Sequence, residues 1–134
     1  MRHLQVLRDM LTVEAREALA WTDWQQPGRT GTQICPLYTC ERGTDGPATA
    51  FLVAFGPGSR GDLHEHADHE LMFVLDGVLQ NDNGDSYTVG DLIIEDPWST
   101  HQVSSRDGCV LLVVRQGPAV PVVGTPEPHA ALAT

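Results

Sequence analysis

The sequence predicts an all-β domain folded as an antiparallel sandwich or barrel. From about residue 32, short apolar runs alternate with turns rich in Gly, Pro, Asn and Asp, at intervals of roughly 8–12 residues. Two of these runs, 71–75 and 110–114, are apolar at every position, which is typical of strands covered on both faces. The 134 residues suffice for one domain with its own core.

The order of elements begins with an arm, expected over residues 1–30. Thr12 precedes a run, 13–19, that suits a short capped helix, and an edge strand followed by an irregular segment is the alternative. The barrel is expected over 31–117, and the tail 118–134 is expected to wrap the surface or to be disordered. The predicted strands are 32–40, 48–55, 70–75, 78–80, 87–89, 92–95, 101–104 and 109–115, with turns at 41–47, 56–58 and 76–77.

The doubly apolar runs require a cover on their outer face. A partner subunit is the simplest cover, so the sequence predicts a homodimer, which a monomer in light scattering would refute. The N-terminal arm is the other candidate for this role.

The composition argues against several functions. The formal net charge is −10, from 18 acidic and 8 scattered basic residues, so neither nucleic acid nor an anionic membrane is an expected partner. No apolar run approaches the roughly 20 residues of a membrane span, and the N-terminus lacks the apolar stretch of a secretion signal, so a cytoplasmic location is expected. Cys35, Cys40 and Cys109 are expected to be reduced thiols, with a Cys35–Cys40 disulfide as the alternative.

His64 and His66 are the first candidate metal ligands. They lie two residues apart in strand-like surroundings, so alternation places both rings on one face. On a straight strand Glu70 would lie about 13 Å beyond His66, whereas a metal–ligand bond is about 2 Å long. The chain is therefore expected to turn at 67–69, so that Glu70 opens the next strand, with Met72 and Val74 on the same inward face.

His101, 31 residues after Glu70 and at the head of a later strand, is the predicted fourth ligand. Three imidazoles and one carboxylate suit one divalent transition metal, and this ligand set does not choose among Fe, Mn, Zn, Ni, Co and Cu. An octahedral ion with four protein ligands keeps two positions for a small-molecule ligand or O₂.

The spacing of these residues resembles the first motif of the cupin superfamily. Gly58, His64, His66, Glu70 and Gly77 match that motif at every spaced position. The resemblance implies a double-stranded β-helix, that is, a jelly-roll cupin barrel.

A looser second cupin motif follows after twelve residues, 78–89. It opens at Gly90-Asp91 and places His101 where the family's ligand is expected. Asp96 stands where cupins usually have Pro, Trp98 where Gly is common, and Ser105 where Asn often closes the motif.

Within the cupins, the chain is most similar to the ChrR-like group, which includes the C-terminal domain of ChrR-type anti-sigma factors and acetylacetone-cleaving dioxygenases. The supporting residues are Trp21, Pro27-Gly28 and Pro36-Leu37-Tyr38. The resemblance implies a metal-dependent dioxygenase that cleaves a diketone-like or hydroxyketone substrate. A non-catalytic metal- and ligand-binding or sensing module is the alternative, and a purely structural metal is a third interpretation.

Several other residues near the motifs have two interpretations. Glu95 orients a ligand histidine or, as the favoured interpretation, is a solvated charge at a strand end. Arg60 receives an anionic substrate or has a surface role, and His69 is expected to face outward. Six apolar residues are expected to line the cavity above the metal or to fill the core: Phe51, Val53, Phe55, Met72, Val74 and Val103.

Overall fold

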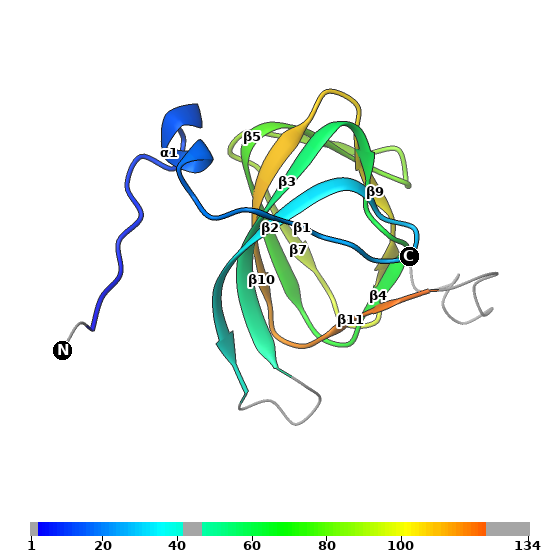
Figure 1. Ribbon diagram of the computed structural model, residues 1–134. Helices are drawn as coiled ribbons and strands as arrows, with labels where there is room; N and C mark the ends of the chain where they lie inside the picture. The colour runs from blue at the N-terminus through cyan, green and yellow to red at the C-terminus, as the bar shows by residue number, and fades with distance from the viewer. Residues whose placement is uncertain (1–2, 42–46, 123–134) are drawn as a thin grey trace.

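The computed structural model describes residues 3–41 and 47–122, and its antiparallel strands close into a barrel (Figure 1). The larger sheet has the order β1-β2-β3-β10-β5-β6, with β7 beside β5 and β9 beside both β3 and β5. Its strands are β1 (Thr22–Asp23), β2 (Thr30–Cys40), β3 (Ala48–Arg60), β5 (Glu70–Asn81), β6 (Ser86–Thr88), β7 (Leu92–Glu95), β9 (Val103–Ser105) and β10 (Cys109–Arg115). The predicted all-β jelly-roll architecture is confirmed.

A smaller sheet of three strands carries three of the four predicted ligands. Its order is β11-β4-β8, formed by β11 (Ala119–Pro121), β4 (His64–His66) and β8 (Thr100–His101). Strand β11 lies in the segment that was expected to be a surface tail, and it pairs with β4 instead. The rest of that tail, 123–134, and residues 42–46 of the predicted loop at 41–47 lie outside the described residues.

Two of the predicted turns, 56–58 and 76–77, are wrong, because β3 and β5 continue through them. In β5 the pairing with β10 shifts between Val110 and Leu111, which marks a bulge. Gly77 has a φ of +73°, and a Cβ there would lie 2.1 Å from the carbonyl oxygen of Gly108. The absence of a side chain thus lets the strand bend and continue where the sequence suggested that it stops.

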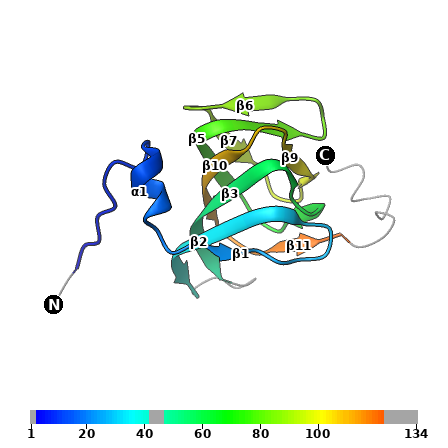
Figure 2. The same ribbon diagram turned by 45° about the horizontal axis from the view of Figure 1, so that its top comes forward.

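The arm forms the short helix α1 (Val13–Glu17), beside the barrel in Figure 2, so the capped-helix interpretation is confirmed. The Thr12 side chain accepts a hydrogen bond from the backbone N–H of Ala15. Arg16, which is buried, forms an ion pair with Asp76 of β5 and donates a hydrogen bond to the carbonyl of Met10. These contacts anchor the arm on the barrel.

The arm covers part of the doubly apolar sheet. Met10, Leu19 and Trp21 pack on an outer cluster whose buried members are Cys35, Leu52 and Leu75. The structure therefore shows the N-terminal arm as a cover of this outer face. Three apolar side chains of β5 and β7 remain exposed, namely Leu71, Leu92 and Ile94. The homodimer finds no support in the structure and stays a prediction for light scattering.

The three cysteines are free thiols, so the alternative of a Cys35–Cys40 disulfide is wrong. Burial raises the pKa of Cys35 and raises that of Cys109 to about 11, which keeps both thiols protonated at neutral pH. Over residues 3–41 and 47–122, the structure has no helix with the length and apolar character that crossing a bilayer requires.

Candidate metal centre

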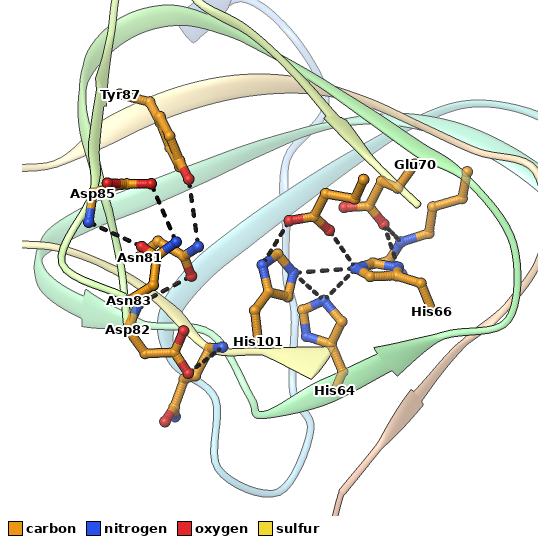
Figure 3. A network of polar contacts seen from close by, with 12 residues as sticks. His64, His66, Glu70, Asn81, Asp82, Asn83, Asp85, Tyr87 and His101 are labelled. Carbon is orange, nitrogen blue, oxygen red and sulfur yellow. Dashed lines mark hydrogen bonds and ion pairs between the residues drawn. The ribbon is translucent and has the colours of Figure 1, made fainter. Parts of the chain in front are cut away.

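Three imidazole rings point toward one another at the junction of β4 and β8 (Figure 3). The pairing of these strands places His64 directly opposite His101, and alternation along β4 puts His66 on the same face. The Nε2 atoms are 3.1 Å apart between His64 and His66, 3.1 Å between His66 and His101, and 2.9 Å between His101 and His64. The nitrogens thus form a nearly equilateral triangle.

The size of this triangle fits three neighbouring ligands of one metal ion. Bonds of about 2.1 Å at right angles separate two such nitrogens by about 3 Å, close to the distances between the three Nε2 atoms. With an oxygen of Glu70 included, the four ligand atoms lie within 4.8 Å of one another. The four residues are only 1–5 % exposed. The structure therefore brings together all four residues that the sequence predicted as ligands.

Glu70 reaches the site in the way the sequence predicts, after a bend at 67–69. It is the first residue of β5, and Met72 and Val74 are buried with it on the inward face. Its Oε2 accepts a hydrogen bond from Nε of Arg115 at 2.6 Å and lies 3.1 Å from Nδ1 of His66. Arg115 of β10 stands directly opposite Glu70 in the sheet, so strand register explains this contact.

A backbone carbonyl orients His64. Its Nδ1 lies 2.9 Å from the carbonyl oxygen of Asp62, so Nδ1–H donates there and leaves the lone pair of Nε2 free for a metal. The carboxylate of Asp62 accepts two hydrogen bonds from Arg29, at 3.0 and 2.6 Å. The ion pair between Asp62 and Arg29 joins segments 33 residues apart, so no local pattern in the sequence predicts it.

Glu95 also faces the three histidines. Its side chain is only 11 % exposed, with Oε2 2.8 Å from Nε2 of His66 and Oε1 2.7 Å from Nδ1 of His101. The favoured interpretation of Glu95 as a solvated charge is therefore wrong. Its close contacts are with two of the candidate ligand histidines, and its role toward them stays a prediction. His69 is exposed, as predicted, and Arg60 has a surface position.

The pKa values show how strongly these groups interact. Burial alone would raise the pKa of Glu70, but Arg115 and His66 lower it to about 2. Burial lowers the pKa of His64 to about 4, helped by repulsion from the other two imidazoles. For His66, contacts with Glu70 and Glu95 overcome burial and raise the pKa to about 9. The buried carboxylates thus attract positive charge into the triangle, and a divalent cation would supply it.

A small cavity adjoins the site. Its volume is about 20 Å³, which is room for about one water molecule. Five of the six apolar residues proposed for the cavity wall line it, while Val74 only fills the core: the five are Phe51, Val53, Phe55, Met72 and Val103. Trp24 closes the wall, with its ring 5.2 Å from that of Phe51 and 3.8 Å from the guanidinium of Arg29. The wall is thus largely apolar, and the guanidinium groups of Arg29 and Arg115 line it beside Trp24.

Comparisons with known proteins agree with this geometry. The family model described as "ChrR Cupin-like domain" matches residues 10–119. A crystal structure of Rhodobacter sphaeroides SigE in complex with the anti-sigma ChrR contains a chain with 25 % identity and a TM-score of 0.60. That match covers 75 % of this chain and 50 % of the other, so the present chain spans half the length of that relative. No curated protein matches the sequence.

Two further solved structures share the fold at lower identity. An acetylacetone dioxygenase from Acinetobacter johnsonii superposes with a TM-score of 0.71 at 12 % identity, over 91 % of this chain and 78 % of that one. The polyketide cyclase RemF from Streptomyces resistomycificus gives a TM-score of 0.66 at 19 % identity, over 89 % and 90 %. Since the family model matches most of the chain, including the barrel with the four candidate ligands, the chain belongs to the ChrR cupin-like family.

Proposed function

We propose that this protein is a metal-dependent cupin that acts on a small organic molecule. One divalent transition metal is held by His64, His66, Glu70 and His101. The observation that carries this proposal is the triangle of imidazole nitrogens, 2.9–3.1 Å apart and buried beside two carboxylates. Three unshielded nitrogens at such distances repel one another unless a proton or a cation lies between them.

Within this proposal the reaction is oxidative cleavage of a diketone-like or hydroxyketone substrate. A bound Fe(II) ion would supply Lewis acidity for the substrate oxygens and a binding position for O₂. The apolar wall formed by Phe51, Met72 and Val103 suits a short carbon chain. The fold shared with an acetylacetone dioxygenase supports this proposal, because that protein carries such chemistry on the same type of barrel.

The protein's own residues orient the ligands for this task. The carbonyl of Asp62 fixes the ring of His64, and Arg115 balances the charge of Glu70. The cavity holds about one water molecule, so a larger substrate requires a wall side chain to move. Trp24 is the candidate for this movement, because it is only partly buried.

A non-catalytic binding or sensing module is the second candidate function. It is favoured by the 25 % identity with ChrR, a protein crystallised in complex with SigE, which also makes a protein partner a candidate for this chain.

Metal analysis and oxygen uptake test these proposals. We expect stoichiometric metal in the purified protein, and loss of that metal in His66→Ala with the barrel still folded. His69→Ala is the matched control, because His69 is exposed and should leave the metal content unchanged. Oxygen uptake by the Fe(II)-loaded protein with small diketones and hydroxyketones would support the dioxygenase. Unchanged recovery of every bound compound would support the binding module, and stoichiometric metal in His66→Ala would contradict the site.

A further inference from the structure

A second carboxylate stands directly beside the first at the metal site. Strand β7 pairs with β5 so that Glu95 is opposite Glu70, and β10 places Arg115 opposite Glu70 on the other side. Two like charges directly opposite one another destabilise a sheet. Arg115 forms its ion pair with Glu70, whereas the close contacts of Glu95 are to His66 and His101. Arg115 therefore does not balance the negative charge of Glu95, and a cation at the imidazoles would balance it.

The geometry of Glu95 differs from that of a hydrogen-bonded carboxylate. Its Oε2 approaches Nε2 of His66 to 2.8 Å, yet this buried oxygen has no hydrogen-bond partner. Nδ1 of His101 likewise has none, although Oε1 of Glu95 lies 2.7 Å away. Oε2 of Glu95 lies about as close to Nε2 of His66 as the other two Nε2 atoms do, without aligning as a hydrogen-bond acceptor, so it is placed like a neighbouring ligand of the same cation. Nδ1 of His101 is not the atom that faces the triangle, so its contact with Oε1 holds the carboxylate beside the site.

We propose that Glu95 is a fifth protein ligand, which supplies a second carboxylate oxygen to the metal. This inference rests on the proposed metal site. Two carboxylates balance the charge of a divalent ion and the three imidazoles are neutral, so the complex has no net charge. An octahedral ion with these five ligands has one remaining coordination position. A single water molecule fills that position, which agrees with a cavity of about 20 Å³. A substrate that binds through two oxygens would have to displace Glu95.

The number of water molecules on a bound Mn²⁺ ion tests this proposal. Mn²⁺ is added to the metal-free protein, and the relaxation of water protons reports how many waters exchange on the ion. We expect one water in the wild type and one more in Glu95→Ala, together with a fall in Mn²⁺ affinity of about 10- to 100-fold. The control is Glu65→Ala, because Glu65 lies between His64 and His66 on β4 and alternates to the opposite face.

The water count separates a ligand from a positioning residue. Removing a residue that only orients His101 also weakens affinity, but it adds no water to the ion, so an unchanged count in Glu95→Ala overturns the proposal. Crystals of the wild type soaked in Mn²⁺ give a second measurement, in which a Glu95 oxygen at bonding distance supports the proposal and a longer separation overturns it. Failure of the wild type to bind Mn²⁺, Fe²⁺ or Zn²⁺ at all would refute the metal site itself.

Discussion

Trp98 adopts a backbone conformation that is unfavourable for its residue type. Its φ is +69°, in the left-handed region, and it stands where the second cupin motif commonly has Gly. The backbone N–H of Trp98 donates a 2.6 Å hydrogen bond to the carbonyl of His66, which ties the turn before β8 to β4. The strain is thus located in the segment that places His101 beside the other candidate ligands.

We expect Trp98→Gly to stabilise the metal-free protein. Relief of the left-handed conformation is worth about 1 kcal/mol, and the side chain is 61 % exposed, so little burial is lost. Urea denaturation measures the difference. Asp9→Gly is the matched control, since Asp9 has a φ of +60° but Asp tolerates this region better than Trp. A lower free energy of unfolding for Trp98→Gly would show that the indole contributes contacts that outweigh the strain.

The four candidate ligands could be predicted from the sequence, whereas the side chains that contact them could not. His64, His66, Glu70 and His101 have spacings that follow from strand alternation and a single bend. Arg115 is different, because its contact with Glu70 depends on the register between β5 and β10, which no local pattern in either strand encodes.

The position of Glu95 beside the histidines was even harder to predict from the sequence. As a charged residue at the end of a predicted strand it resembles many solvated glutamates, and only its position opposite Glu70 brings it to the histidines. Contacts between distant strands thus determine its role, and they become visible only in the assembled barrel.

At the scale of elements, glycines that the sequence suggested as strand ends serve instead as bends within long strands. The prediction of strand ends fails because glycine is typical both of turns and of bulges, and pairing with the neighbouring strands decides between the two. In β5, β10 continues to pair on both sides of the register shift next to Gly77, so the strand is continuous. This continuity lets one strand contribute Glu70 to the site and also support β6 and β9.

Substitution of Gly77 by Ala should prevent stable folding. A Cβ at this position would lie 2.1 Å from the oxygen and 2.9 Å from the carbon of the Gly108 carbonyl, and 2.8 Å from the Cα of Cys109, which begins the paired strand β10. We expect a loss of more than about 4 kcal/mol. Gly84→Ala is the matched control, because Gly84 also has a positive φ but nothing lies within 4 Å of its Cβ position, and its cost should be about 1–2 kcal/mol. Circular dichroism and urea denaturation compare the two, and equal costs would contradict a steric role for Gly77.

For the whole molecule, the candidate ligands join two sheets. His64, His66 and His101 come from the smaller sheet, and Glu70 comes from the larger one. A metal bound by all four would link the two sheets by direct bonds. Because an unfolded chain does not preserve this arrangement, metal binding favours the folded state.

Removal of metal should therefore lower the stability of the whole barrel. With free metal at about a thousand times its Kd, binding is expected to stabilise the fold by about 4 kcal/mol. The measurement is the Tm of the protein after chelation and again after stepwise addition of Zn²⁺ or Fe²⁺. His66→Ala should show almost no increase, whereas His69→Ala should follow the wild type, because only the buried histidine belongs to the triangle. An equal rise in Tm for His66→Ala would place the stabilising ion at a different site, and the link between the two sheets would then not depend on these four residues.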